Sequence, residues 1–212
     1  RQALQRKVLE TSIDICARLG LDPLVLHYEQ ASRDSRVEAA FVEGHARAAD
    51  QAAREGLTLC IENIEVERFE PLLELVRQVD RQNFRIAFDT GHAWLSAHYF
   101  HFDFLQAFRS CLPHLGHLHL SDNPGVFEEL RIRDRPAYDA LPMRYRYAFG
   151  SGDIHLPPFW GSVPFDDLLR LLHPSGYHGM YVCEYYSEHF LPFARSIQER
   201  VRAAVEGARV GP

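Results

Sequence analysis

Short apolar runs alternate with helical stretches along most of the chain. Each run is four to six residues long and is typical of a buried strand in a parallel sheet. The runs that we interpret as strands are Leu24–His27, Leu57–Glu62, Arg85–Asp89, Leu115–Leu120 and Met180–Glu184. This alternation predicts repeated βα units and therefore an α/β fold.

The stretches between these runs carry apolar residues at helical spacing. They cover residues 1–20, about 35–55, about 70–80, about 104–111, 165–172 and about 193–207. Two of them close at a glycine, Gly20 and Gly56, which is a common way for a helix to end. We therefore predict a helix before the first strand and one after the last.

The spacing between the strand ends agrees with this interpretation. The potential metal ligands at or next to the ends of the five runs are His27, Glu62, Asp89, His119 and Glu184, and they are separated by 35, 27, 30 and 65 residues. The first three separations each match one βα unit, which takes roughly 30 residues. The fourth is longer, so we expect an irregular loop insertion at about 121–163.

Composition adds limits to this picture. The chain has 212 residues with 46% apolar and 25% charged positions, which predicts a single globular domain over residues 1–212. No apolar run reaches the roughly 18 residues of a membrane span and no signal peptide opens the chain, so we expect a cytoplasmic protein without a membrane partner.

Net charge argues against a nucleic-acid partner, and the spacing of the cysteines argues against a CxxC metal or redox motif. The formal net charge of −6 does not favour nucleic acid as a partner, although a local basic patch could still bind one. The four cysteines are too dispersed for a CxxC metal or redox motif, which favours buried thiols in a reducing compartment.

A residue that can bind a metal stands last or next to last in each of the five predicted strands. Side chains alternate along a strand, and Glu62, Asp89 and His119 each lie on the face opposite to their apolar neighbours. Carboxylates and imidazoles gathered at one sheet edge are costly to bury unless a cation lies between them. A single acid at a strand end usually caps a helix, but five in phase predict a metal site at the mouth of a (β/α) barrel.

Further candidates lie close to this set. His92 follows Asp89 by three residues, and Asp153 and His155 form an Asp-x-His pair that could chelate a metal or remain solvated. His117 shares the face of His119 and could be structural. The 121–163 segment also interleaves arginines with aromatic residues, a composition that could hold a phosphate or stack on bases. We expect this segment to be a lid over the mouth.

Several segments resemble the xylose isomerase-like TIM-barrel superfamily, which holds sugar phosphate isomerases and epimerases and endonuclease IV-type AP endonucleases. The matching segments cover most of the chain from Leu21 onward. They are Leu-Cys-Ile-Glu62-Asn63, Phe-Asp89-Thr-Gly-His92-Ala, His117-Leu-His119-Leu-Ser-Asp122-Asn123, Asp153-Ile-His155-Leu-Pro, Gly176-Tyr177-His-Gly179 and Tyr-Val-Cys-Glu184.

The resemblance implies a divalent metal ion (Mn, Mg, Co or Zn) held by Glu62, Asp89, His119 and Glu184. In the epimerases and isomerases of this superfamily the two glutamates also move protons, and the histidine at the His92 position helps to hold substrate. In the AP endonucleases three zinc ions are bound. The positions that match their additional ligands are His27, His92, Asp153 and His155.

Two departures separate the sequence from the family pattern. The family barrel has eight strands, whereas this chain shows five, which we take to be the last five βα units of a (β/α)8 TIM barrel truncated at its N-terminus. The chain also opens at Arg1 inside a helical pattern, as a fragment would. The usual Gly-x-Gly after the Asp-x-His pair is replaced here by Phe159-Trp160-Gly161.

Three functions follow as hypotheses. The first is a metal-dependent isomerase or epimerase of a sugar or sugar phosphate, in which Glu62 and Glu184 transfer a proton through an enediolate and His92 orients the substrate. The second is a zinc-dependent phosphodiesterase of the AP endonuclease kind. The third is a non-catalytic relative or fragment that binds a metabolite or partner, with its open sheet edges covered in a homo-oligomer.

Overall fold

The computed structural model describes residues 2–28 and 34–209 and has an α/β fold. The described strands are parallel and follow one another in the sheet in chain order, β1-β2-β3-β4-β5. The strands are β1 (Leu24–His27), β2 (Leu59–Glu62), β3 (Phe84–Asp89), β4 (Leu115–Leu120) and β5 (Tyr181–Cys183). All five strands predicted from the sequence are confirmed, with ends that differ by no more than two residues.

The described residues form two compact units. The first comprises the chain up to Ile64 together with Phe69–Ala87 and His114–His117, and the second comprises Glu65–Arg68, Phe88–Pro113 and the chain from Leu118. The boundary between the units runs through β3 and β4, so each unit holds a part of these two strands.

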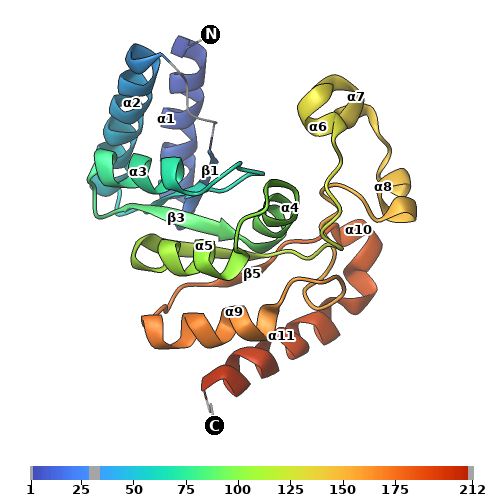
Figure 1. Ribbon diagram of the computed structural model, residues 1–212. Coiled ribbons are helices and arrows are strands. Elements are labelled where there is room, and N and C mark those ends of the chain that lie inside the picture. The colour runs from blue at the N-terminus through green and yellow to red at the C-terminus, as the bar shows by residue number, and fades with distance from the viewer. Residues whose placement is uncertain (1, 29–33, 210–212) are drawn as a thin grey trace. The chain divides into compact units, whose positions relative to one another are not determined.

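The first unit contains β1, β2 and most of β3. His27 pairs in register with Glu62, and Glu62 with Ala87, so β1 and β2 end at the same edge. Helices α1 (Gln2–Leu19) and α2 (Ser35–Arg54) lie side by side, and α2 also packs on α3 (Glu70–Val79) (Figure 1). All four residues of β2 are buried, as expected for a strand with apolar neighbours on both faces.

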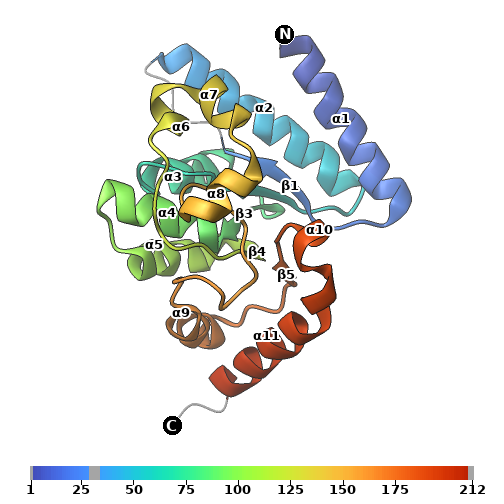
Figure 2. The ribbon, with the colours of Figure 1, turned by 90° about the vertical axis from the view of Figure 1, so that its right-hand side faces the viewer.

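The second unit pairs the end of β4 with β5, with His119 opposite Val182. Its helices include α4 (Thr90–Phe100), α5 (Phe104–Cys111), α9 (Phe165–Leu172) and α11 (Ala194–Arg209). Helix α9 packs against both α5 and α11 (Figure 2). The rings of Phe88 and Phe108 meet at 4.9 Å in the core of this unit. Short elements complete the chain: α10 (Ser187–Phe190) and the 3-10 helices Leu112–His114, His173–Ser175 and Leu191–Phe193.

The 121–163 insertion is more ordered than the sequence pattern predicts. It contains three short helices, α6 (Leu130–Arg133), α7 (Arg135–Ala140) and α8 (Met143–Phe149). Asp122 and Leu156 exchange two backbone hydrogen bonds of 2.9 and 2.8 Å, which join the two ends of the insertion. The prediction of an irregular segment is therefore wrong for residues 130–149.

Two further findings concern the predictions from composition. None of the described helices is long and apolar enough to cross a membrane. All four cysteines lie in the described part of the chain and carry free thiols, of which Cys60 and Cys111 are buried while Cys16 and Cys183 are partly exposed.

Candidate metal centres

Asp89 is held rigidly at the junction of β3 and α4. Its carboxylate caps α4 by accepting a hydrogen bond of 2.7 Å from the backbone N–H of His92. The hydroxyl of Ser121 lies 3.0 and 3.1 Å from the two carboxylate oxygens. Asp89 is fully buried, so it can serve as a ligand but is not reached by solvent.

His119 and Glu184 face each other from neighbouring strands. The Nδ1 of His119 lies 2.8 Å from Oε2 of Glu184, and the backbone N–H of Glu184 donates to Leu120. Burial opposes ionisation of Glu184, but the hydrogen bond and charge of His119 hold the pKa of this carboxyl below its ordinary value. Glu184 is therefore a carboxylate, and its side chain is 41% exposed against 11% for His119.

These three side chains form a group that suits a divalent cation. Asp89, His119 and Glu184 each offer one ligand atom, and these atoms lie within 4.8 Å of one another. Two carboxylates this close repel each other where solvent is largely excluded, and a cation between them removes that cost. Carboxylate oxygens with one imidazole nitrogen are suitable donors for zinc or manganese. The residues present fit a bound metal ion.

Glu62 and His27 are described within the first unit. Glu62 ends β2 with its side chain buried, and Oε2 lies 3.7 Å from Nε2 of His27. The His27 side chain is 74% exposed at the end of β1. Their predicted roles as metal ligands stay predictions.

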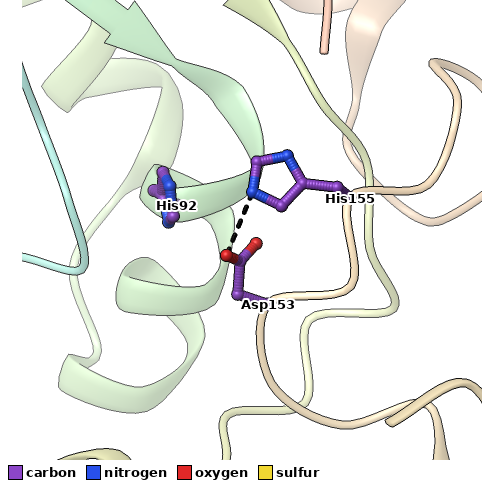
Figure 3. A group of neighbouring side chains, drawn as sticks. All are labelled: His92, Asp153 and His155. Atoms are coloured by element: carbon purple, nitrogen blue, oxygen red, sulfur yellow. Dashed lines mark hydrogen bonds and ion pairs between the residues drawn. The ribbon is translucent and has the colours of Figure 1, made fainter. Parts of the chain in front are cut away.

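A second group of potential ligands lies in the second unit. The side chains of His92, Asp153 and His155 offer ligand atoms within 4.8 Å of one another. His92 comes from α4, while Asp153 and His155 come from the loop after α8 (Figure 3). The Nε2 of His155 lies 3.0 Å from Oδ2 of Asp153, and the two histidine rings meet edge to face at 5.5 Å. Three of the further candidates from the sequence are thus brought together.

The charges in this second group depend on one another. Burial opposes ionisation of Asp153, but the charges of His92 and His155 hold the pKa of its carboxyl well below the ordinary value. Burial likewise opposes protonation of His155, yet Asp153 raises its pKa to about 9. The carboxylates of Asp153, Glu65 and Asp89 raise the pKa of His92 in spite of its burial. In the absence of a cation, protonated histidines supply the positive charge that the carboxylates require.

Glu65 lies beside this second group of potential ligands, and the sequence did not identify it as a candidate. Its carboxylate is 2% exposed, lies 3.3 Å from Nδ1 of His92 and forms an ion pair with Arg131. It follows Glu62 by three residues in a loop with no periodic pattern, so nothing in the local sequence marks it.

The arginines of the insertion are largely engaged within the protein. Arg133 pairs with Glu129, and Arg135 with Asp139. Arg131 pairs with Glu65, and Arg146 is buried. Three arginines of the insertion are therefore paired with carboxylates, which leaves fewer free cations for the phosphate or base contact that the sequence suggested.

Comparisons with known proteins agree with the fold. The family model for the xylose isomerase-like TIM barrel matches residues 1–210. No curated protein matches the sequence. Among solved structures, a xylose isomerase domain protein from Planctomyces limnophilus is 17% identical, with a TM-score of 0.71 over 97% of this chain and 67% of that chain.

Two other solved structures are similar. The IolI protein with a bound zinc atom is 16% identical, with a TM-score of 0.64 over 96% of this chain and 68% of that chain. A D-tagatose 3-epimerase-like protein is 19% identical, with a TM-score of 0.62 over 94% of this chain and 72% of that chain. At this identity the likeness establishes the shared fold, and the chain spans about two thirds of the length of these structures.

Proposed function

Because the chain belongs to the xylose isomerase-like TIM barrel family, we propose that it is a metal-dependent isomerase or epimerase acting on a ketose sugar or sugar phosphate. The family match and the epimerase-like solved structure support an enzyme of this kind. The ketose substrate class is taken from the D-tagatose 3-epimerase-like solved structure. The first metal group, in which a partly exposed glutamate lies beside two other potential ligands, supports it.

The exposure of Glu184 is the observation that carries this proposal. Asp89 is fully buried, whereas the Glu184 side chain is 41% exposed and its carboxylate is held ionised by His119. A substrate can reach Glu184 but not Asp89. We therefore assign proton transfer to Glu184 and a purely ligating role to Asp89.

We propose that Glu62, Asp89, His119 and Glu184 hold the metal, with Glu62 placed in this set by the sequence resemblance. A divalent ion bound there supplies positive charge next to the substrate oxygens, which makes the proton on the carbon beside a carbonyl more acidic. Glu184 accepts that proton. By the sequence resemblance, Glu62 would be the acid that returns a proton to this carbon, which leaves Glu62 as a carboxylate and Glu184 protonated.

Deuterium incorporation tests this function directly. The wild-type protein, loaded with Mn²⁺ or Zn²⁺, is incubated in D₂O with D-tagatose, D-psicose and L-ribulose, and exchange beside the carbonyl is followed by NMR. We expect one of these ketoses to gain deuterium. Glu184→Gln and Glu62→Gln should each lower the rate by about 10²- to 10⁴-fold, because each removes a general acid or base.

A matched control uses Glu188, an exposed glutamate on α10. Glu188→Gln should leave the exchange rate unchanged. Exchange that persists within tenfold in Glu184→Gln would contradict the assignment. A sugar that binds without any deuterium incorporation would instead favour a non-catalytic relative.

The second group of ligands favours one alternative function. His92, Asp153 and His155 match positions that ligate zinc in the AP endonucleases, and they lie together in the structure. We propose zinc-dependent phosphodiester cleavage as the second candidate. Elemental analysis and an abasic-site DNA substrate distinguish the two: about three zinc ions per chain with strand cleavage would support the phosphodiesterase, and one metal ion without cleavage would support the epimerase.

A further inference from the structure

We infer that the helical insertion, residues 130–149, positions the second group of ligands (His92, Asp153 and His155) from two sides, with Glu65, Arg131 and Tyr138 as positioning residues. The inference rests on the proposed function in one respect, which is that this group binds a metal ion or a substrate. The contacts that position the group do not depend on it. They give the segment that the sequence predicts to be a lid a structural role beside these ligands.

The first connection runs through Glu65 to His92. Glu65 is buried between Nδ1 of His92, at 3.3 Å, and the guanidinium of Arg131 on α6. A carboxylate next to one ring nitrogen of a histidine fixes the orientation of the ring and directs its other nitrogen toward a ligand. Arg131 in turn holds the carboxylate, since a buried acid without a cationic partner is costly.

The second connection runs through Tyr138 to Asp153. The Tyr138 hydroxyl accepts a hydrogen bond of 3.2 Å from the backbone N–H of Asp153. Arg146 on α8 donates to the carbonyl of Asp153 at 3.3 Å and to the carbonyl of Tyr138 at 3.0 Å. Both polar groups of the Asp153 backbone are thus bound by side chains of the insertion, which fixes the point from which the carboxylate projects.

The aromatic ring of Tyr138 organises the cations around it. The guanidinium groups of Arg131, Arg135 and Arg146 lie 5.4, 5.9 and 4.1 Å from its centre, and the side chain is almost fully buried. Each guanidinium is attracted to the face of the aromatic ring, and this attraction is stronger where solvent is excluded. Arg131 and Arg146 therefore share one support although they act on different ligands.

The backbone on either side of Asp153 shows the same tight placement. Gly152 has a φ of +75°, and a Cβ there would lie 3.2 Å from the Tyr138 ring. His155 adopts a φ of +42°, an uncommon conformation for a residue with a side chain. Strained backbone of this kind persists where the surrounding structure holds it, and it is frequent at ligand-binding sites.

Zinc affinity tests the inference in the full chain. Competition with a chromophoric chelator measures the affinity of the second group in wild type and in Glu65→Gln, Arg131→Gln and Tyr138→Phe. We expect each variant to weaken this affinity by about 10- to 100-fold, as loss of a group that orients a ligand does elsewhere. The affinity of the first group, measured in the same titration, should stay within twofold.

Arg133→Gln is the matched control, because Arg133 lies on α6 beside Arg131 but pairs with the exposed Glu129. It removes the same charge from the same helix. Both zinc affinities should be unchanged in this variant.

Histidine ring NMR of the metal-free protein separates this inference from the proposed function. With ¹⁵N-labelled histidine, assigned through His92→Gln and His155→Gln, we expect Glu65→Gln and Arg131→Gln to shift the His92 ring nitrogens and Tyr138→Phe to shift those of His155. Shifts without any second zinc ion in wild type would support positioning and refute the second metal site. Unmoved ring resonances, or zinc affinities within twofold of wild type, would overturn the inference.

Discussion

At the scale of single residues, Asp89 has two roles, and the same sequence feature, an acid at the end of a strand, predicts either of them. An acid at a strand end is most often a helix cap, and Asp89 does cap α4. It also lies in the group of potential metal ligands with His119 and Glu184. The two roles use different properties, since a cap needs only an acceptor oxygen whereas a metal ligand benefits from full negative charge.

Asp89→Asn separates these two roles. Asparagine caps helices about as well as aspartate, so we expect the free energy of unfolding to fall by no more than about 1 kcal/mol. Metal affinity of the first group should fall more than tenfold because a charged ligand is lost. Chemical denaturation and chelator competition measure the two effects. Asp103→Asn, at the cap of α5, is the control in which metal affinity should not change.

Gly161, the last residue of the altered Gly-x-Gly, occupies a position where only glycine fits without steric overlap. Its N–H donates to the Asp122 carboxylate at 2.8 Å, and a Cβ would lie 2.4 Å from Oδ1 of Asp122. Phe159, at the first position of the altered Gly-x-Gly, adopts a φ of +70°, which a glycine accepts more readily. Its ring packs on Phe165 at 4.9 Å and lies 4.6 Å from the guanidinium of Arg200, and these contacts offset the strain.

Gly161→Ala should therefore destabilise the protein by about 1–3 kcal/mol through steric overlap. Gly44→Ala provides a control of opposite sign, because Gly44 lies inside α2 with nothing within 4 Å of an added Cβ. Alanine there should stabilise by about 1 kcal/mol. Urea unfolding measures both variants, and equal effects of the two would refute the steric argument.

At the scale of elements, the success of the sequence predictions depends on periodicity. All five strands were predicted because each is a compact apolar run with a polar residue at or beside its end. Helix α4 was missed because it has no polar face, since seven of its first eight residues are buried. Helices α6, α7 and α8 were missed because none is longer than seven residues, about two turns, which is too short to show a period.

Helix α2 carries a pH effect of its own. His45 lies against the Phe41 carbonyl at 2.8 Å and packs on Phe84, and burial lowers the pKa of its ring. A histidine whose pKa is lower in the folded state contributes stability above its unfolded pKa of about 6.5 and loses it as the pH falls toward the folded value. The loss is about 1.4 kcal/mol for each unit by which the two pKa values differ.

His45→Gln should accordingly make unfolding less sensitive to acid. We expect the difference in unfolding free energy between wild type and variant to be constant above about pH 7.5. Between pH 6.5 and 5 the unfolding free energy of the wild type should fall more than that of the variant. Urea unfolding at pH 5, 6, 7 and 8 measures this difference. A wild-type advantage that stays the same at all four values would contradict a lowered pKa.

At the scale of the whole molecule, the candidate site was predictable where the fold rule applies and hidden where it does not. Parallel strands bring their carboxyl ends to one edge, so Asp89, His119 and Glu184 could be grouped from the sequence alone. The ion pair of Glu65 and Arg131 joins a loop to a short helix 66 residues later, and no period or motif links the two. An ion pair of this kind depends on how the insertion packs against the rest of its unit. A local sequence pattern does not determine that packing.

Metal binding should also be visible in the stability of the whole chain. A metal ion that binds the folded state at 100 times its dissociation constant adds about 2.7 kcal/mol, which corresponds to a rise in melting temperature of roughly 5–10 °C for a chain of this size. We expect this rise on adding Mn²⁺ or Zn²⁺ to chelator-treated protein, measured by differential scanning fluorimetry. Glu184→Ala should reduce the rise strongly, because the remaining ligands bind less tightly, whereas Glu188→Ala should keep it. A wild-type melting temperature that responds to neither metal nor chelator would remove the physical basis of the first metal group. The repulsion between the Asp89 and Glu184 carboxylates would then have to be offset by groups of the protein alone.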